Sequence, residues 1–70
     1  MPTQIGVLIN GSKQSVPQGT TLEDLVALFS LQKKAVIIEH NHQVADKAAY
    51  QAIQLNDKDQ VEIVHFVGGG

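Results

Sequence analysis

Residues 5–9 are mostly apolar, with β-branched side chains at positions 5, 7 and 9. This spacing puts them on one face of a strand. Asn10 and Gly11 follow, and this pair favours a tight hairpin turn because both residues tolerate a positive φ. Residues 12–16 are polar-rich and predict a returning strand near a sheet edge. Pro17 ends that strand, because proline has no N–H to donate to a neighbour.

The apolar spacing then changes to that of a helix, predicted over residues 22–30. A threonine at its start can cap a free backbone N–H, and Glu23 and Asp24 lie in the first turn, where the helix dipole favours negative charge. Apolar residues separated by three or four positions form one face, which we expect in the core. These residues are Leu22, Leu25, Val26 and Phe29.

The second half of the chain predicts short elements. They are a strand over 35–39, a turn over 40–43, a brief strand at Val44, a helical turn over 46–53, a polar turn over 56–59 and a final strand over 61–67. Tyr50 and Ile53 are expected to point inward. A sheet covered on one face by a single helix follows from this order.

The amino-acid composition argues against several classes of protein. The chain has 70 residues, enough for one domain, and it contains no cysteine, so the hydrophobic 43% must form the core unaided. The net charge is −2, which with the absence of arginine weighs against a nucleic-acid partner. No apolar run approaches the roughly 20 residues of a membrane span. The first residues resemble no signal peptide, so we expect a cytoplasmic location without membrane attachment.

The chain ends in Gly68, Gly69 and Gly70. Glycine loses much freedom on folding, so these residues finish a structural element poorly but suit a thin tail that enters a narrow slot. We therefore divide the chain into a domain over 1–67 and a flexible tail over 68–70. The reactive group of such a tail is the carboxylate of Gly70, and we expect no catalytic residues because no catalytic motif is present. A disordered end without function is the alternative.

Strand alternation suggests which residues of the final strand face outward. If Val61 and Ile63 face the helix, Glu62, Val64 and Phe66 lie on the opposite face. Ile37 is expected beside them on a neighbouring strand. We predict that these outward residues form a docking surface anchored by Val64 and Phe66, with a core position as the alternative for Phe66.

Three histidines raise the possibility of zinc. His40 and His42 are separated by one residue, and His65 could lie nearby. A turn beside polar residues is the simpler interpretation, and we expect no metal.

The order of elements resembles the β-grasp fold of ubiquitin-like proteins. The fold class is then α+β, a mixed sheet of about four to five strands on one main helix. The last residues, 63–70, together with Asn10–Gly11, the segment 22–25 and the run 36–41, resemble the ThiS family of sulfur carrier proteins in thiamine biosynthesis.

This resemblance implies a chemical role for the terminal carboxylate. An E1-like adenylating enzyme of the ThiF family would join Gly70 to AMP, using ATP and magnesium that this chain does not bind itself. Sulfur from a cysteine desulfurase would convert the adenylate into a thiocarboxylate, for delivery to thiazole synthase of the ThiG family. Gly68 and Gly69 would fit the partner's channel. The chain would be a co-substrate, not an enzyme.

Ubiquitin-like proteins with other functions also end in glycine residues. The small, sulfur-carrying subunit of molybdopterin synthase has this fold and a glycine pair, and a ubiquitin-like protein modifier would form isopeptide bonds through Gly70. An inert ubiquitin-like binding module would tolerate a residue added after Gly70, whereas a carrier would not.

Overall fold

The computed structural model describes residues 3–66. Its strands are β1 (Gln4–Ile9), β2 (Ser12–Pro17), β3 (Val36–His40), β4 (Gln43–Val44) and β5 (Gln60–His65). Its helices are α1 (Leu22–Leu28) and two 3₁₀ turns, η1 (Lys33–Ala35) and η2 (Lys47–Ala49). No helix among these residues is long and apolar enough to cross a membrane.

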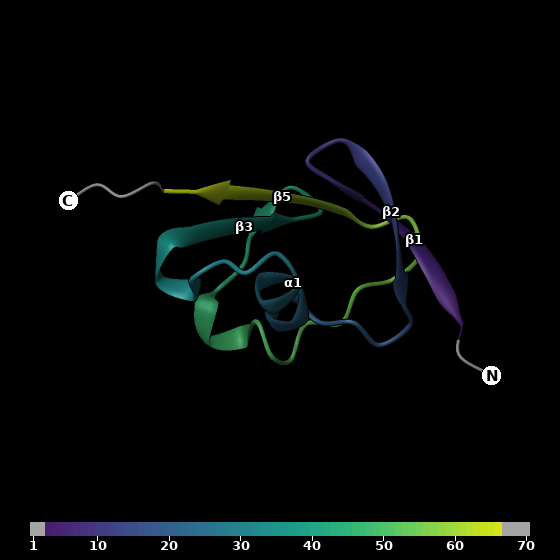
Figure 1. Cartoon of the computed structure of the whole chain (residues 1–70), viewed down its shortest axis with the longest axis horizontal. Coiled ribbons are helices and arrows are strands. Elements are labelled where there is room, and N and C mark those ends of the chain that lie inside the picture. Colours follow the sequence, from purple (N-terminus) through teal and green to yellow (C-terminus); the bar gives the residue numbers. More distant parts are fainter. Residues whose placement is uncertain (1–2, 67–70) are drawn as a thin grey trace.

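The strands form one mixed sheet in the order β2-β1-β5-β3-β4. β1 and β5 are parallel, while the other neighbouring pairs are antiparallel. Figure 1 shows α1 on one side of the sheet, below β3 and β5 in this view. The predicted β-grasp arrangement is confirmed, and β5, the last strand in the sequence, lies at the centre of the sheet.

Local signals explain most of these elements. Asn10 and Gly11 have φ values of 51° and 82° and form the predicted turn between β1 and β2. Thr21 caps α1: its side chain accepts from the Asp24 N–H, and its own N–H donates to the Asp24 carboxylate. The helix ends at Leu28, two residues earlier than predicted. Ser30 has a φ of 55°, which is incompatible with a continuing helix.

Buried hydrophobic residues from the sheet, from α1 and from the segment between β4 and β5 form a single core. They are Ile5, Val7, Ile9, Val16, Leu22, Leu25, Val26, Val36, Ile38, Tyr50, Leu55 and Val61. Tyr50 is fully buried and Ile53 partly so, which confirms their inward orientation.

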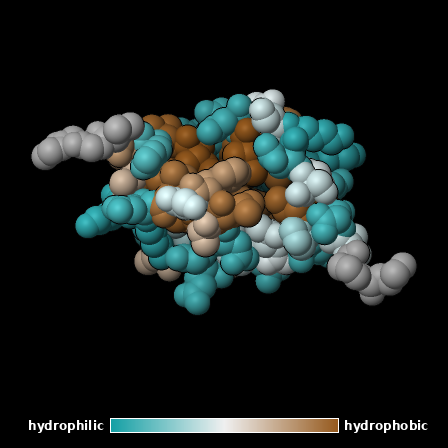
Figure 2. Space-filling view, viewed as in Figure 1, coloured by the Kyte–Doolittle hydropathy of each residue, from teal (hydrophilic) through white to brown (hydrophobic). Residues whose placement is uncertain are grey.

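The prediction for Phe29 is wrong, because its side chain is 39% exposed. It lies at the end of α1, where the chain turns away from the helical direction. Leu28 is also exposed. Figure 2, drawn in the same view as Figure 1, shows hydrophobic residues gathered in the middle of the visible face, in the region of α1.

Strand boundaries differ from the predictions by one or two residues in the second half of the chain. β3 begins at Val36, and β4 comprises two residues that include Val44, as predicted. β5 begins at Gln60 and ends at His65, before the predicted end at Val67. Val67 itself lies outside the described residues.

Candidate functional site around the end of strand β5

The predicted working residues Gly68, Gly69 and Gly70 lie outside the part of the chain that the structure describes. Their roles remain predictions. What the structure places is the strand that leads toward them and the side chains that hold this strand. The candidate site is therefore built around β5 and Phe66, the last described residue.

On one side, β5 is held by β3 along its whole length. The register places Val64 opposite Ile37, so both side chains lie on the same face of the sheet. Beyond the strand, the Phe66 N–H donates to the Ala35 carbonyl at 2.8 Å. Pairing with the β3 side therefore continues to the last described residue.

The outer face of this pair exposes apolar side chains. Ile37, Val64 and Phe66, which we call the outer patch, are 37%, 50% and 52% exposed. The core alternative for Phe66 is thus not supported. Glu62 is exposed as predicted, and its register partner is Glu39 on β3. The sequence-predicted docking residues therefore lie together, while their use in docking remains a prediction.

On its other side, β5 is held by β1 and then by a side chain. The Asn10 N–H donates to the Val61 carbonyl at 2.9 Å. The Asn10 carboxamide then contacts the backbone of Ile63 twice: Oδ1 accepts from the Ile63 N–H at 2.7 Å, and Nδ2 donates to the Ile63 carbonyl at 3.3 Å. Sequence reasoning identified Asn10 only as a turn residue, because its partner is 53 positions away.

A polar cluster holds the start of β5. Asp59 is only 8% exposed, and its Oδ2 lies 2.7 Å from His40 Nε2 and accepts from the Asn56 N–H at 2.8 Å. Its Oδ1 accepts from Asn41 Nδ2 at 3.2 Å. Burial by itself raises the pKa of Asp59, but the hydrogen bonds from His40, Asn56 and Asn41 outweigh burial and leave this pKa lower than usual. The polar turn was predicted correctly, but its buried carboxylate was missed.

The three histidines do not converge. His40 is opposite Val61 and His65 is opposite Val36, so they lie at opposite ends of the β3–β5 ladder. Within residues 3–66 no group of three or more His, Cys, Asp or Glu side chains is arranged to hold a metal ion.

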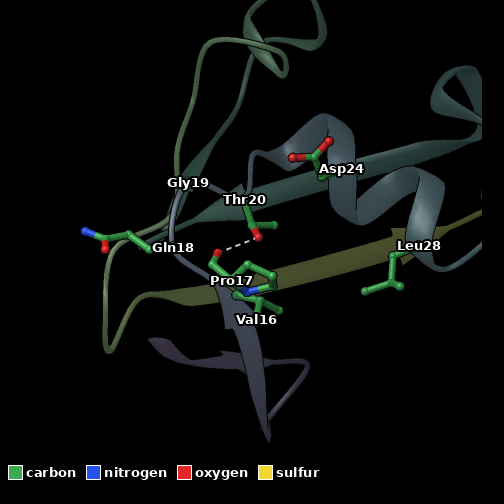
Figure 3. Close-up of a pocket in the computed structure, with 7 residues that line it drawn as sticks. All are labelled: Val16, Pro17, Gln18, Gly19, Thr20, Asp24 and Leu28. Carbon is green, nitrogen blue, oxygen red and sulfur yellow. Dashed lines mark hydrogen bonds between the residues drawn. The ribbon is translucent and has the colours of Figure 1, made fainter. Parts of the chain in front are cut away.

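A surface hollow lies away from this site, in the part of the chain that the structure describes. It has a volume of about 390 Å³ and lies between α1 and the loop after β2 (Figure 3). Thr20 Oγ1 donates to the Pro17 carbonyl at 2.6 Å within it. Among its lining residues, all in the described part of the chain, Asp24 is the one ionisable side chain, and it is engaged in capping α1. The hollow therefore offers no catalytic pair.

Comparison with known proteins gives three findings. The sequence model described as "ThiS family" matches residues 4–70. The chain is 48% identical over 50 residues to the sulfur carrier protein ThiS of Bacillus subtilis (strain 168), covering 71% of this chain and 76% of that protein. The crystal structure of a thiamine biosynthesis protein (ThiS) from Geobacter metallireducens superimposes with a TM-score of 0.79 at 28% identity, covering 94% of this chain and 100% of the other.

A further relative is much longer. The chain is 39% identical over 62 residues to a protein named thiazole synthase from Magnetococcus marinus. The match includes 89% of this chain but 19% of that protein. The similarity therefore concerns one segment of that protein and leaves most of its length unmatched.

Proposed function

The chain belongs to the ThiS family, and on that premise we propose that it is a sulfur carrier of thiamine biosynthesis whose working group is the carboxylate of Gly70. The observation that most supports this role is that the family match extends through the C-terminal glycines, beyond the central strand β5. The relative named as a sulfur carrier favours it over a molybdopterin synthase subunit or a protein modifier. In this role the chain is a co-substrate and not an enzyme.

A carboxylate must be activated before sulfur can replace its oxygen. In the proposed sequence, a ThiF-type enzyme with ATP and magnesium forms the Gly70 acyl adenylate and releases pyrophosphate. A persulfide derived from a cysteine desulfurase attacks the acyl carbon and expels AMP, which leaves an acyl disulfide. A thiol then attacks the outer sulfur, supplies the two electrons needed, and releases the Gly70 thiocarboxylate together with a new disulfide.

The proposed acceptor of this sulfur is a thiazole synthase of the ThiG type. The Magnetococcus marinus relative supports this assignment, because a segment similar to most of this chain is joined there to the remainder of a protein named thiazole synthase.

The outer patch is the proposed docking surface for these partners. Ile37, Val64 and Phe66 are exposed apolar residues close to the end of the described chain, and Glu62 lies on the same face. A partner surface with an apolar centre and a basic rim matches this arrangement. Binding there would place the end of β5, and the residues after it, near the partner's active centre.

Intact-mass measurement tests the proposed function. The chain is incubated with a ThiF-type enzyme, ATP, magnesium and a sulfur donor, and we expect the mass gain of one sulfur-for-oxygen exchange. A chain extended by one residue after Gly70 is the matched control and should gain nothing at the internal Gly70. Lack of exchange, with an enzyme preparation that modifies an established ThiS carrier, would contradict the proposal.

A further inference from the structure

Backbone pairing extends further along β5 on the side of β3 than on the side of β1. The bonds from Asn41 N–H to the Gln60 carbonyl and from Phe66 N–H to the Ala35 carbonyl fix the β3–β5 ladder. Even-numbered residues of β5 therefore bond to β3, and the peptide groups of Val61 and Ile63 face β1. In the described structure, β1 pairs with β5 only as far as Val61, because the chain turns away at Asn10.

The carboxamide of Asn10 occupies the position where the next residue of β1 would have paired. An amide has the same donor and acceptor as a peptide group, and Asn10 uses both on Ile63, at 3.3 Å and 2.7 Å. The φ of 51° turns the backbone out of the strand and leaves the side chain to continue along it. Asn10 thus forms part of the turn and also extends the hydrogen bonding on the β1 side of β5 from Val61 to Ile63.

We propose that Asn10 is a positioning residue: its carboxamide holds the second half of β5 in the sheet and so fixes the path of the chain toward Gly70. The residue after Ile63 is Val64, whose position opposite Ile37 makes the outer patch continuous. Loss of the carboxamide would leave this segment attached through β3 alone. This inference rests on the proposed function, since it concerns presentation of the same terminal group.

The chain contains a matched control in Asn41. It also has a φ of 51° in a hairpin turn, and its Oδ1 also accepts from a β5 backbone N–H, that of Gln60, at 2.9 Å. The difference is location, because Gln60 is the first residue of β5 and Ile63 lies in its second half. Asn10→Gly and Asn41→Gly both keep a residue that accepts positive φ, and each removes one carboxamide.

The experiment compares these variants as full-length chains. Steady-state adenylation by a ThiF-type enzyme should show a KM about tenfold higher for Asn10→Gly with kcat unchanged, because two net hydrogen bonds that preorganise the free carrier are lost. For Asn41→Gly we expect a KM within about twofold of the wild type, despite lower stability. Amide hydrogen exchange should accelerate at Ile63 and Phe66 in Asn10→Gly and not in Asn41→Gly.

A third variant tests the geometry of the contact. Asn10→Asp keeps an acceptor for the Ile63 N–H but faces the Ile63 carbonyl with a second oxygen. It should therefore recover part of the exchange protection at Ile63 and part of the lost KM. Full recovery would show that the donated hydrogen bond has no role in positioning.

The outcomes separate the two proposals. Equal increases of KM in Asn10→Gly and Asn41→Gly would show that Asn10 acts only through the stability of the fold. Unchanged amide exchange at Ile63 and Phe66 in Asn10→Gly would overturn its positioning role. If the wild-type chain is not adenylated at all, the proposed function fails. The exchange rates alone then decide whether Asn10 holds the end of β5.

Discussion

At its start, β5 is bound through the nearly buried carboxylate of Asp59, whereas its second half is bound through an exposed carboxamide and one neighbouring strand. The Asp59 carboxylate is contacted by two side chains, those of His40 and Asn41, and by the backbone N–H of Asn56. The second half of β5 leaves apolar side chains at half exposure. This difference is consistent with a strand whose first residues stabilise the fold and whose second half exposes apolar side chains to binding partners.

The largest effect on stability is expected from a substitution that removes the Asp59 carboxylate at the start of β5. Asp59→Asn places an NH₂ group against at least one of the donors that now meet a carboxylate. We expect a loss of about 1.5–3 kcal/mol in the free energy of unfolding at neutral pH, the range for hydrogen bonds to a charged group. Urea unfolding measures this loss, and a loss below about 0.5 kcal/mol would show that the cluster is not a stabilising anchor.

The same variant gives a pH dependence with a definite sign. Hydrogen bonding lowers the pKa of folded Asp59 despite its burial, below the unfolded value of about 3.9. The stabilisation by the carboxylate is therefore complete above about pH 4 and is lost as the pH falls through the folded pKa. The wild type should lose its advantage over Asp59→Asn below about pH 4, and an advantage that grows on acidification would contradict this assignment.

Substitutions in the outer patch should weaken binding to the partner and leave the fold intact. Val64→Thr combined with Phe66→Ser keeps a β-branched residue in the strand and removes apolar surface from the outer patch. We expect the KM for the adenylating enzyme to rise about tenfold, since central apolar contacts often contribute over 1 kcal/mol to binding.

The matched control for the outer patch is Val44→Thr. Val44 is 68% exposed and pairs with Glu39, so it lies on the same face but at the edge strand β4. Its substitution should leave KM unchanged. Equal effects of the two changes would show that the partner does not distinguish the outer patch from the rest of this face.

The N-cap of α1 lies outside β5, so its loss should affect stability without affecting binding. Thr21→Ala removes the side-chain acceptor for the Asp24 N–H at the start of α1. We expect a loss of about 1 kcal/mol in stability, typical of an N-cap, measured by urea unfolding. The KM for the adenylating enzyme should stay at the wild-type value, because α1 packs against the core and does not contact the end of β5 through this cap. A raised KM would show that KM follows global stability and would weaken the arguments drawn from β5.

The sequence predicted the elements whose signals are local. The Asn10–Gly11 turn, the threonine cap and the burial of Leu22 and Leu25 all depend on residues within a few positions of one another. The contacts that distinguish the two ends of β5 join residues far apart, such as Asn10 with Ile63, and depend on a register that no local pattern specifies.

Phe29 and Asp59 illustrate two further limits. Periodicity placed Phe29 in the core, but the helix ended before it, where Ser30 adopts a positive φ. Asp59 looked like an ordinary turn residue, and its burial follows from the way β3 and β5 meet. In contrast, alternation along β5 correctly predicted which side chains face outward, since one buried residue, Val61, sets the orientation of the rest.

The smallest effects are expected at Glu62, where one substitution should stabilise the fold and weaken binding. Glu62 and Glu39 are directly opposite on the same face, where like charges repel. Glu62→Gln should therefore raise the Tm by about 1–2 °C, and the gain should disappear at high salt. If Glu62 meets a basic rim of the partner, the same change should raise KM by about twofold at low salt. A variant that is more stable yet binds less well would separate the two functions of β5 within one side chain, whereas a Tm and KM that both improve would assign the carboxylate of Glu62 no part in docking.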